Sequence, residues 1–236
     1  MPPTALDRQP PGSRVMTMPR KRVAVLISGR GSNMRALVEA AKAETFPADI
    51  VVVISNRPDA AGLAYAASAG IATVTIDHTR FGNDREAFER ALHNELQSRS
   101  VDLVCLAGFM RLLTPWLVQQ WSGHMLNIHP SLLPSFKGLH THEAALEAGV
   151  RIHGATVHFV VPEMDSGPII GQAAVAVDNH DTPQSLADRV LAAEHRLYPL
   201  ALRLVAEDRV RIEDGRCIVS GTAAANDAMI VPDDGH

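Results

Sequence analysis

Residues 22–44, RVAVLISGRGSNMRALVEAAKAE, join an apolar segment to an amphipathic one through a turn that holds two glycines. RVAVLIS (22–28) lacks polar alternation, as expected of a strand covered on both faces. Met34, Leu37, Val38 and Ala41 then follow the i, i+3, i+4, i+7 spacing of a helix with one buried face. The stretch therefore predicts a strand, a tight turn and a helix.

The same alternation continues along the chain. Further strands are expected at 50–55, 73–76, 101–108 and 125–128, and helices at 60–69, 83–99 and 115–121. Apolar strands separated by helices predict an α/β fold, a Rossmann-like, mostly parallel twisted sheet with helices on both faces. Ligands of such sheets bind beyond the carboxyl ends of the strands. Functional residues should therefore follow strands.

Composition limits the function classes. The chain has 236 residues, 46% of them hydrophobic and 20% charged, with a formal net charge of −4. That balance gives no basic footprint for nucleic acid, and no run of 18 apolar residues predicts a membrane span. The two cysteines, Cys105 and Cys217, form no secreted disulfide framework, so we expect a cytoplasmic location. We expect a disordered Pro-rich extension over 1–20 without a signal peptide, one domain over 21–220 and a loose tail over 221–236.

The turn SGRGSN (28–33) predicts an anion site, because a helix N-terminus offers free N–H groups and partial positive charge. A dinucleotide fingerprint fits poorly, since Met34 stands at its third glycine and no acidic residue ends the second strand. A P-loop is excluded because no Gly-Lys-Ser/Thr follows. A single phosphate monoester is the favoured ligand, and a plain turn with a helix cap is the alternative.

After the fourth predicted strand comes GFMRLLTP (108–115). Phe109, Met110, Leu112 and Leu113 could line a flat apolar slot with Arg111 at its edge. The alternative is core packing before a helix opened by Thr114 and Pro115.

NIHPSLLPSFKGLHTH (127–142) follows the fifth strand. Asn127 and His129 are two residues apart, so they point the same way if the strand persists. An amide donor beside a histidine suits proton transfer and stabilisation of an oxyanion. His140 and His142 resemble a metal-ligand pair, but the surrounding sequence has no metal motif, and we expect no metal.

HGATVHFVVPEMDSGPII (153–170) predicts a strand with one core face, followed by a turn that holds Asp165. An aspartate in a turn is often only a turn-former. The functional alternative is a carboxylate facing His129 that fixes the tautomer of its ring.

Together SGRGSN, AGFMRLL, NIHPSLLPSFKGLHTH, HGATVHFV and MDSGPII resemble the glycinamide ribonucleotide formyltransferase family over about residues 21–212. The resemblance implies transfer of a formyl group from the co-substrate 10-formyltetrahydrofolate to the amine of glycinamide ribonucleotide, in purine biosynthesis. It also implies the catalytic residues Asn127, His129 and Asp165, and the ribonucleotide-binding residues Gly31, Ser32, Asn33 and Glu194. The folate-binding residues that it implies are Arg85, Met110, Arg111, Leu112, Leu113, Asn127, Val161, Pro162, Glu163, Met164 and Asp165.

Two features depart from the family, and two alternatives stay open. Residues 191–193 are Leu-Ala-Ala where relatives often carry polar side chains, and the Pro-rich extension lies outside the pattern. The alternatives are a formyltetrahydrofolate deformylase-like hydrolase and a non-catalytic nucleotide-binding module. A homodimer is compatible with the sequence, which does not fix the oligomeric state.

Overall fold

The computed structural model describes residues 19–221 and 229–231. The expectations for residues 1–18 and for most of the C-terminal tail therefore lie outside the described residues. Within the described part, regular elements run from Lys21 to Val219, and no helix is long and apolar enough to cross a bilayer.

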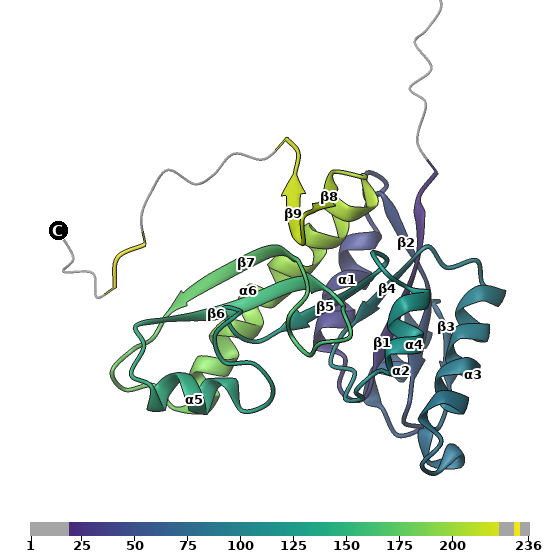
Figure 1. Cartoon of the computed structure of the whole chain (residues 1–236), viewed down its shortest axis with the longest axis horizontal. Coiled ribbons are helices and arrows are strands. Elements are labelled where there is room, and N and C mark those ends of the chain that lie inside the picture. The colour runs from purple at the N-terminus through teal and green to yellow at the C-terminus, as the bar shows by residue number, and fades with distance from the viewer. Residues whose placement is uncertain (1–18, 222–228, 232–236) are drawn as a thin grey trace, which may run out of the picture.

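A seven-stranded sheet forms the centre of the described chain (Figure 1). In spatial order the strands are β3 (Ala72–Thr75), β2 (Ala48–Ser55), β1 (Lys21–Ile27), β4 (Leu103–Leu106), β5 (Met125–His129), β6 (Ile152–Phe159) and β7 (Ile169–Ala176). The first five strands along the chain pair in parallel, whereas β6 runs antiparallel to both β5 and β7. The mostly parallel sheet predicted from the sequence is confirmed.

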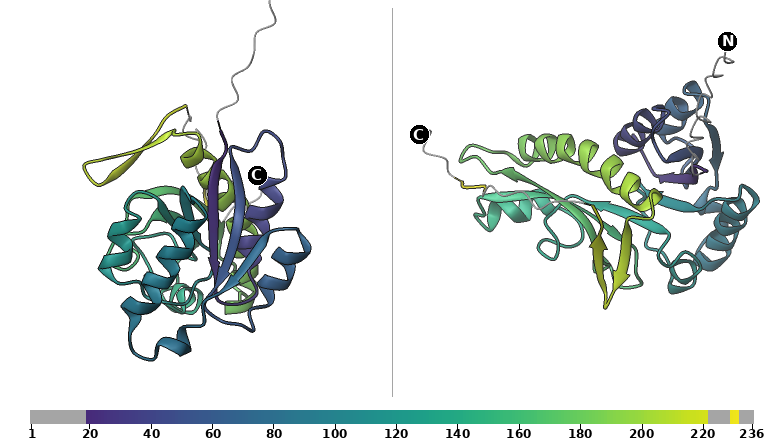
Figure 2. Two further views of the ribbon diagram at one scale, coloured as in Figure 1. Left: turned by 90° about the vertical axis from the view of Figure 1, so that its right-hand side faces the viewer. Right: turned by 90° about the horizontal axis from the view of Figure 1, so that it is seen from above.

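Helices cover both faces of this sheet, as Figures 1 and 2 show. On β1, Val23, Val25 and Ile27 enter one apolar cluster, while Ala24 and Leu26 enter the other. The first cluster contains side chains of α1 (Ser32–Ala41), α2 (Ala61–Ser68), α5 (Thr141–Glu147) and α6 (Pro183–Ala206). The second contains side chains of α3 (Arg85–Ser98) and α4 (Pro115–Gln120). Two short elements complete the fold, the 3-10 helix η1 (His78–Phe81) and the hairpin β8 (Val210–Glu213)–β9 (Arg216–Val219), whose second strand contacts β7 (Figure 2).

Helix ends follow the signals in the sequence. Asp84 caps α3 by accepting a hydrogen bond from the backbone N–H of Ala87. Gly70 follows α2 with φ +75°, a left-handed conformation that glycine adopts at low cost. Thr182 opens α6 through a reciprocal capping box with Ser185, and the helix continues across Pro199.

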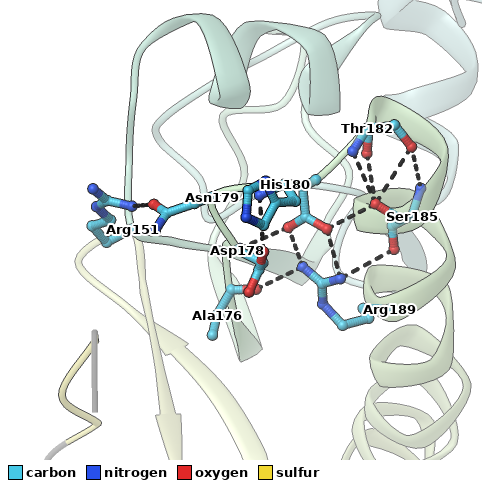
Figure 3. Close-up of polar contacts among 9 residues, drawn as sticks. Arg151, Ala176, Asp178, Asn179, His180, Thr182, Ser185 and Arg189 are labelled. Atoms are coloured by element: carbon cyan, nitrogen blue, oxygen red, sulfur yellow. Dashed lines mark hydrogen bonds and ion pairs between the residues drawn. The ribbon is translucent and has the colours of Figure 1, made fainter. Parts of the chain in front are cut away.

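The start of α6 is tied to the end of β7 by an ion pair between a buried carboxylate and a partly exposed guanidinium (Figure 3). The Arg189 guanidinium donates to both carboxylate oxygens of Asp181 and to the carbonyl of Ala176. Hydrogen bonds from Arg189 hold the pKa of Asp181 well below its usual range, and its side chain is only 3% exposed. This clamp fixes the helix that carries Glu194.

The prediction of a single core face for the strand at 153–159 is wrong, because every residue from His153 to Phe159 is buried. Ala155, Val157 and Phe159 enter the first apolar cluster. The segment after β5 covers the opposite face, where Thr156 accepts a hydrogen bond from Leu133 N–H and donates one to the Ser131 carbonyl. Sequence alternation marks the apolar face but cannot reveal that a distant loop covers the polar one.

Candidate active site

Asn127 and His129 lie on β5 and, being two residues apart on a strand, point to the same side of the sheet. The antiparallel partner β6 places His158 opposite Asn127 and Thr156 opposite His129. The site is therefore built across the β5–β6 pair. Its position at the carboxyl end of a central parallel strand is the one expected for a ligand site in an α/β sheet.

Asp165 lies beside His129, as the functional interpretation of the turn predicted. The Nδ1 atom of His129 is 3.5 Å from an oxygen of Asp165, and the two side chains are 6% and 11% exposed. The other ring nitrogen, Nε2, lies 3.0 Å from the carbonyl oxygen of Phe136. Both ring nitrogens thus face oxygen acceptors, and only a protonated imidazole has a hydrogen for each.

The turn that carries Asp165 is held against the loop after β5. Asp165 has φ +50°, and its second carboxylate oxygen accepts a hydrogen bond from the backbone N–H of Gly138 at 2.9 Å. Lys137 donates to the hydroxyl of the neighbouring Ser166 at 2.6 Å. These contacts hold the turn that carries Asp165 against residues 137–138.

The loop after β1 (residues 28–31) leads into α1 at the position where an anion site is predicted, and we call it the anion loop. Gly31, with φ +70°, precedes α1, and a Cβ atom there would lie 2.9 Å from Met34 and 3.3 Å from the Cα of Gly62. The glycine thus allows the first N–H groups of α1 to open on a cavity of about 420 Å³. Arg30, Arg57 and Arg111 are among the residues that line it, which gives the cavity a positive character.

Hydrogen bonds join this loop to the one after β4. The Ser28 hydroxyl donates to Asn56 at 2.6 Å and accepts from the backbone N–H of Met110 at 2.8 Å. The backbone N–H of Ser28 also donates to the carbonyl of Gly108. The predicted ribonucleotide and folate segments therefore form one connected surface.

Asn33 and Glu194 meet beneath the anion loop. The amide nitrogen of Asn33 donates to the Glu194 carboxylate at 2.7 Å, and both residues are buried. Burial raises the pKa of Glu194, although the bond from Asn33 opposes the shift. One turn later, the Tyr198 hydroxyl contacts the carbonyls of Leu106 and Leu126, which anchors this part of α6 to β4 and β5.

The structure divides the predicted apolar slot into two parts. Phe109 and Leu113 pack against the second core cluster, as the packing alternative predicted for the segment. Met110 and Leu112, by contrast, are 70% and 64% exposed. Arg85, the first residue of α3, donates to the backbone carbonyl of Leu112 and so holds this loop.

The remaining predicted folate residues, Val161 to Asp165, form the loop between β6 and β7. Met164 is exposed, and its terminal methyl lies 4.0 Å from the position of a Cβ atom on Gly138. This loop and the segment after β5 therefore approach each other beside His129.

His140 and His142, which resemble a metal-ligand pair in the sequence, lie in two different environments. His140 is exposed beside Glu143, whereas His142 packs edge-on against the buried His153. Desolvation lowers the pKa of His153 to about 4. In the part of the chain that the structure describes, no three His, Cys, Asp or Glu side chains form a group that could hold a metal.

His158 was not among the residues predicted for the site. Its Nε2 lies 3.3 Å from the amide nitrogen of Asn127, and its Nδ1 lies 2.9 Å from the carbonyl oxygen of Phe159. The alternation of the strand, HGATVHF, placed His158 on the same face as Thr156, but nothing in the sequence paired that face with Asn127.

An amide close to a histidine with a carboxylate partner, together with a glycine-bearing helix N-terminus on the same sheet, is compatible with an enzyme that transfers an acyl-type group to a phosphorylated acceptor. The formyl transferase family model matches residues 21–202. The chain belongs to the formyl transferase family.

Two curated relatives are similar to this chain over most of its length. The trifunctional purine biosynthetic protein adenosine-3 of Bos taurus is 52% identical over 200 residues, covering 84% of this chain and 20% of the relative. This chain thus spans about a fifth of that relative's length. The phosphoribosylglycinamide formyltransferase of Escherichia coli (strain K12) is 44% identical, with coverage of 84% of this chain and 93% of the relative.

Solved structures give the same family. The crystal structure of glycinamide ribonucleotide transformylase 1 from Symbiobacterium toebii matches with TM-score 0.82 and 47% identity, covering 85% of this chain and 94% of the other. A formyltetrahydrofolate deformylase from Pseudomonas syringae pv. tomato is more distant in sequence, at 29% identity and TM-score 0.79, covering 86% and 67%.

Proposed function

We propose that this chain transfers the formyl group of 10-formyltetrahydrofolate to the amine of glycinamide ribonucleotide. The observation that carries the proposal is the presence of two sites on one parallel sheet, the first after β1 and the second on β5, with β4 between them. One is an anion loop suited to a phosphate, and the other is Asn127 with His129 and Asp165. A hydrolase acting on the folate alone has no use for the first of these sites.

The chemistry requires no covalent enzyme intermediate. The amine nitrogen of the ribonucleotide attacks the formyl carbon, and a carbon–nitrogen bond forms as the carbonyl oxygen becomes negative. The bond from that carbon to N10 of the folate then breaks, while a proton leaves the attacking nitrogen and N10 gains one. The amide N–H of Asn127 and the positive charge of a protonated His129 stabilise the oxyanion.

Asp165 acts on His129 in this scheme. The Asp165 carboxylate, 3.5 Å from Nδ1, holds the orientation of the ring and stabilises the positive charge that this mechanism places on it. Apo hydrogen bonds at active sites are often long and shorten in the substrate complex, so the 3.5 Å separation suits this role.

Substrate binding follows the two surfaces of the site. The phosphate would accept hydrogen bonds from the N–H groups of Gly31, Ser32 and Asn33, and the Glu194 carboxylate would accept from the ribose hydroxyls. The folate would lie against Met110–Leu113 and the loop 161–165, with Arg85 holding the backbone between them. The free thiols of Cys105 and Cys217 support a cytoplasmic setting for the reaction.

The test supplies 10-formyltetrahydrofolate to the purified protein with and without glycinamide ribonucleotide. Formyl transfer that requires the ribonucleotide supports the proposal. Release of formate without the ribonucleotide would identify a deformylase, and no turnover under either condition would identify a binding module. Replacing the ribonucleotide by its unphosphorylated nucleoside is the matched control, because the anion loop should make the phosphate necessary for efficient turnover.

A further inference from the structure

His158 is a buried histidine directly opposite Asn127. It lies near the end of β6, where the pairing with β7 shifts register between Val157 and His158, and it is 3% exposed. Such irregularities in a sheet often re-aim a side chain beside a functional site. The two nitrogens of the ring face different groups, and together they determine which nitrogen carries the hydrogen.

The tautomer of His158 follows from its neighbours. Nδ1 lies 2.9 Å from the carbonyl oxygen of Phe159, which can only accept, so Nδ1 must carry the hydrogen. Desolvation by burial lowers the pKa of His158, which keeps the ring neutral. A neutral ring protonated at Nδ1 has a bare lone pair at Nε2.

That lone pair determines how the Asn127 amide is oriented. The Asn127 group 3.3 Å from Nε2 must be a donor, so it is the NH₂ end of the amide and not the oxygen. One of its two N–H bonds points to His158. Within residues 19–221 and 229–231, no other protein group hydrogen-bonds the Asn127 side chain, so the second N–H stays free for a ligand.

We propose that His158 is a positioning residue, which holds the Asn127 amide with its nitrogen toward the reacting carbonyl and its oxygen away from it. This role rests on the proposed formyl transfer. The reason for a positioning residue is physical: the nitrogen and oxygen of an amide occupy nearly the same volume, so shape alone does not choose between them. A flipped amide would place its own oxygen against the developing oxyanion and repel it.

The Nδ1 side of the His158 ring lies against the turn that contains Gly167. Gly167, in the turn after Asp165, lies so close that a Cβ atom there would be 1.7 Å from the Phe159 carbonyl oxygen and 3.3 Å from Nδ1 of His158. Any side chain at this position would displace the carbonyl that sets the tautomer. The turn that brings Asp165 to His129 therefore also closes over the Nδ1 side of His158.

The tautomer is measured on the free protein by nitrogen-15 NMR of the histidine rings, with His158 assigned by comparison with His158→Gln. The expected spectrum has a protonated Nδ1 and an unprotonated Nε2 near neutral pH. A hydrogen on Nε2, or a doubly protonated ring, would overturn the proposal. Because this measurement needs no turnover, it stays informative even if the formyl transfer itself were disproved.

Kinetics test the consequence. His158→Leu should lower kcat by about tenfold to a hundredfold, below the ~10²–10³-fold cost of deleting an oxyanion donor outright, and leave both KM values nearly unchanged. His158→Gln should restore most of kcat, because its side-chain oxygen can accept from Asn127. In an Asn127→Ala background, His158→Leu should have no further effect. Equal losses in the Gln and Leu variants, or full additivity with Asn127→Ala, would contradict the proposal. If His158→Leu fails to fold, the tautomer measurement on the unaltered protein decides.

Discussion

Asp165→Asn removes the charge that faces His129 while keeping the shape of the side chain. Asparagine tolerates the left-handed conformation seen at Asp165, with φ +50°, and its oxygen can still accept from Gly138 N–H. Two unit charges 3.5 Å apart interact by about 4–5 kcal/mol at an effective dielectric constant of about 20. At 1.36 kcal/mol for each factor of ten, the upper limit is a loss of roughly 10³-fold in rate.

We therefore expect kcat of Asp165→Asn to fall by on the order of 10²–10³, within the range typical of acid–base catalysis. Both KM values should change far less, because the charge acts chiefly as the oxyanion forms. Steady-state kinetics with each substrate varied in turn measures both quantities. Circular dichroism and thermal melting check that the variant is folded.

Glu143→Gln is the matched control. Glu143 also faces a histidine, His140, at 3.4 Å, but that pair is exposed and should contribute little. Its loss should leave kcat unchanged. If folded Asp165→Asn keeps kcat within a few-fold of the unaltered enzyme, Asp165 is only a turn residue and the mechanism is wrong.

Three further variants test the substrate surfaces. Ser32→Asp puts a carboxylate in the first turn of α1, a position where a helix tolerates negative charge. The carboxylate should repel the substrate phosphate, so KM for the ribonucleotide should rise strongly without loss of stability. Equal weakening of folate binding would show that the loop is only structural. Leu112→Asp should raise KM for the folate with the fold retained. Leu200→Asp, at a comparably exposed leucine of α6, should leave that KM unchanged. Equal effects of the two variants would show that Met110–Leu113 do not bind the folate. Glu194→Gln should raise KM for the ribonucleotide yet stabilise the protein near neutral pH. The folded pKa of Glu194 is raised, so its contribution to stability is present below about pH 4 and is lost as pH rises through the folded pKa. Melting curves of the two proteins should therefore converge in acid, and a constant offset at every pH would contradict this origin of the effect.

Local patterns predicted the parallel half of the fold well. The strand predicted at 22–28 is β1, Lys21–Ile27, and the helix predicted at 83–99 is α3, Arg85–Ser98, which Asp84 caps. These segments carry their own signals, namely apolar runs, helical spacing and capping residues. The strand predicted at 101–108 is shorter, Leu103–Leu106, because the chain leaves the sheet to form the loop that starts at Gly108.

The antiparallel half was harder to predict. No local pattern predicts α5, β7 or the β8–β9 hairpin as separate elements. The segment after β5 ends in α5, whose seven residues are too few to show a helical period. Strand β7 is defined by its pairing with β6, a contact between distant residues that no local pattern encodes.

The difference between the parallel and antiparallel parts of the sheet also explains which site residues could be predicted. In the parallel part of the sheet, Gly31 and Met110 follow strand ends, and fold class alone indicates where to look. His158 depends instead on the register of the β5–β6 pair, which sets it opposite Asn127. A slip of one residue in that register would turn His158 to the other face of the sheet and leave the Asn127 amide free to rotate. The join between the parallel and antiparallel parts therefore does more than end the sheet, because it sets a side chain near the end of β6 against the Asn127 amide of β5.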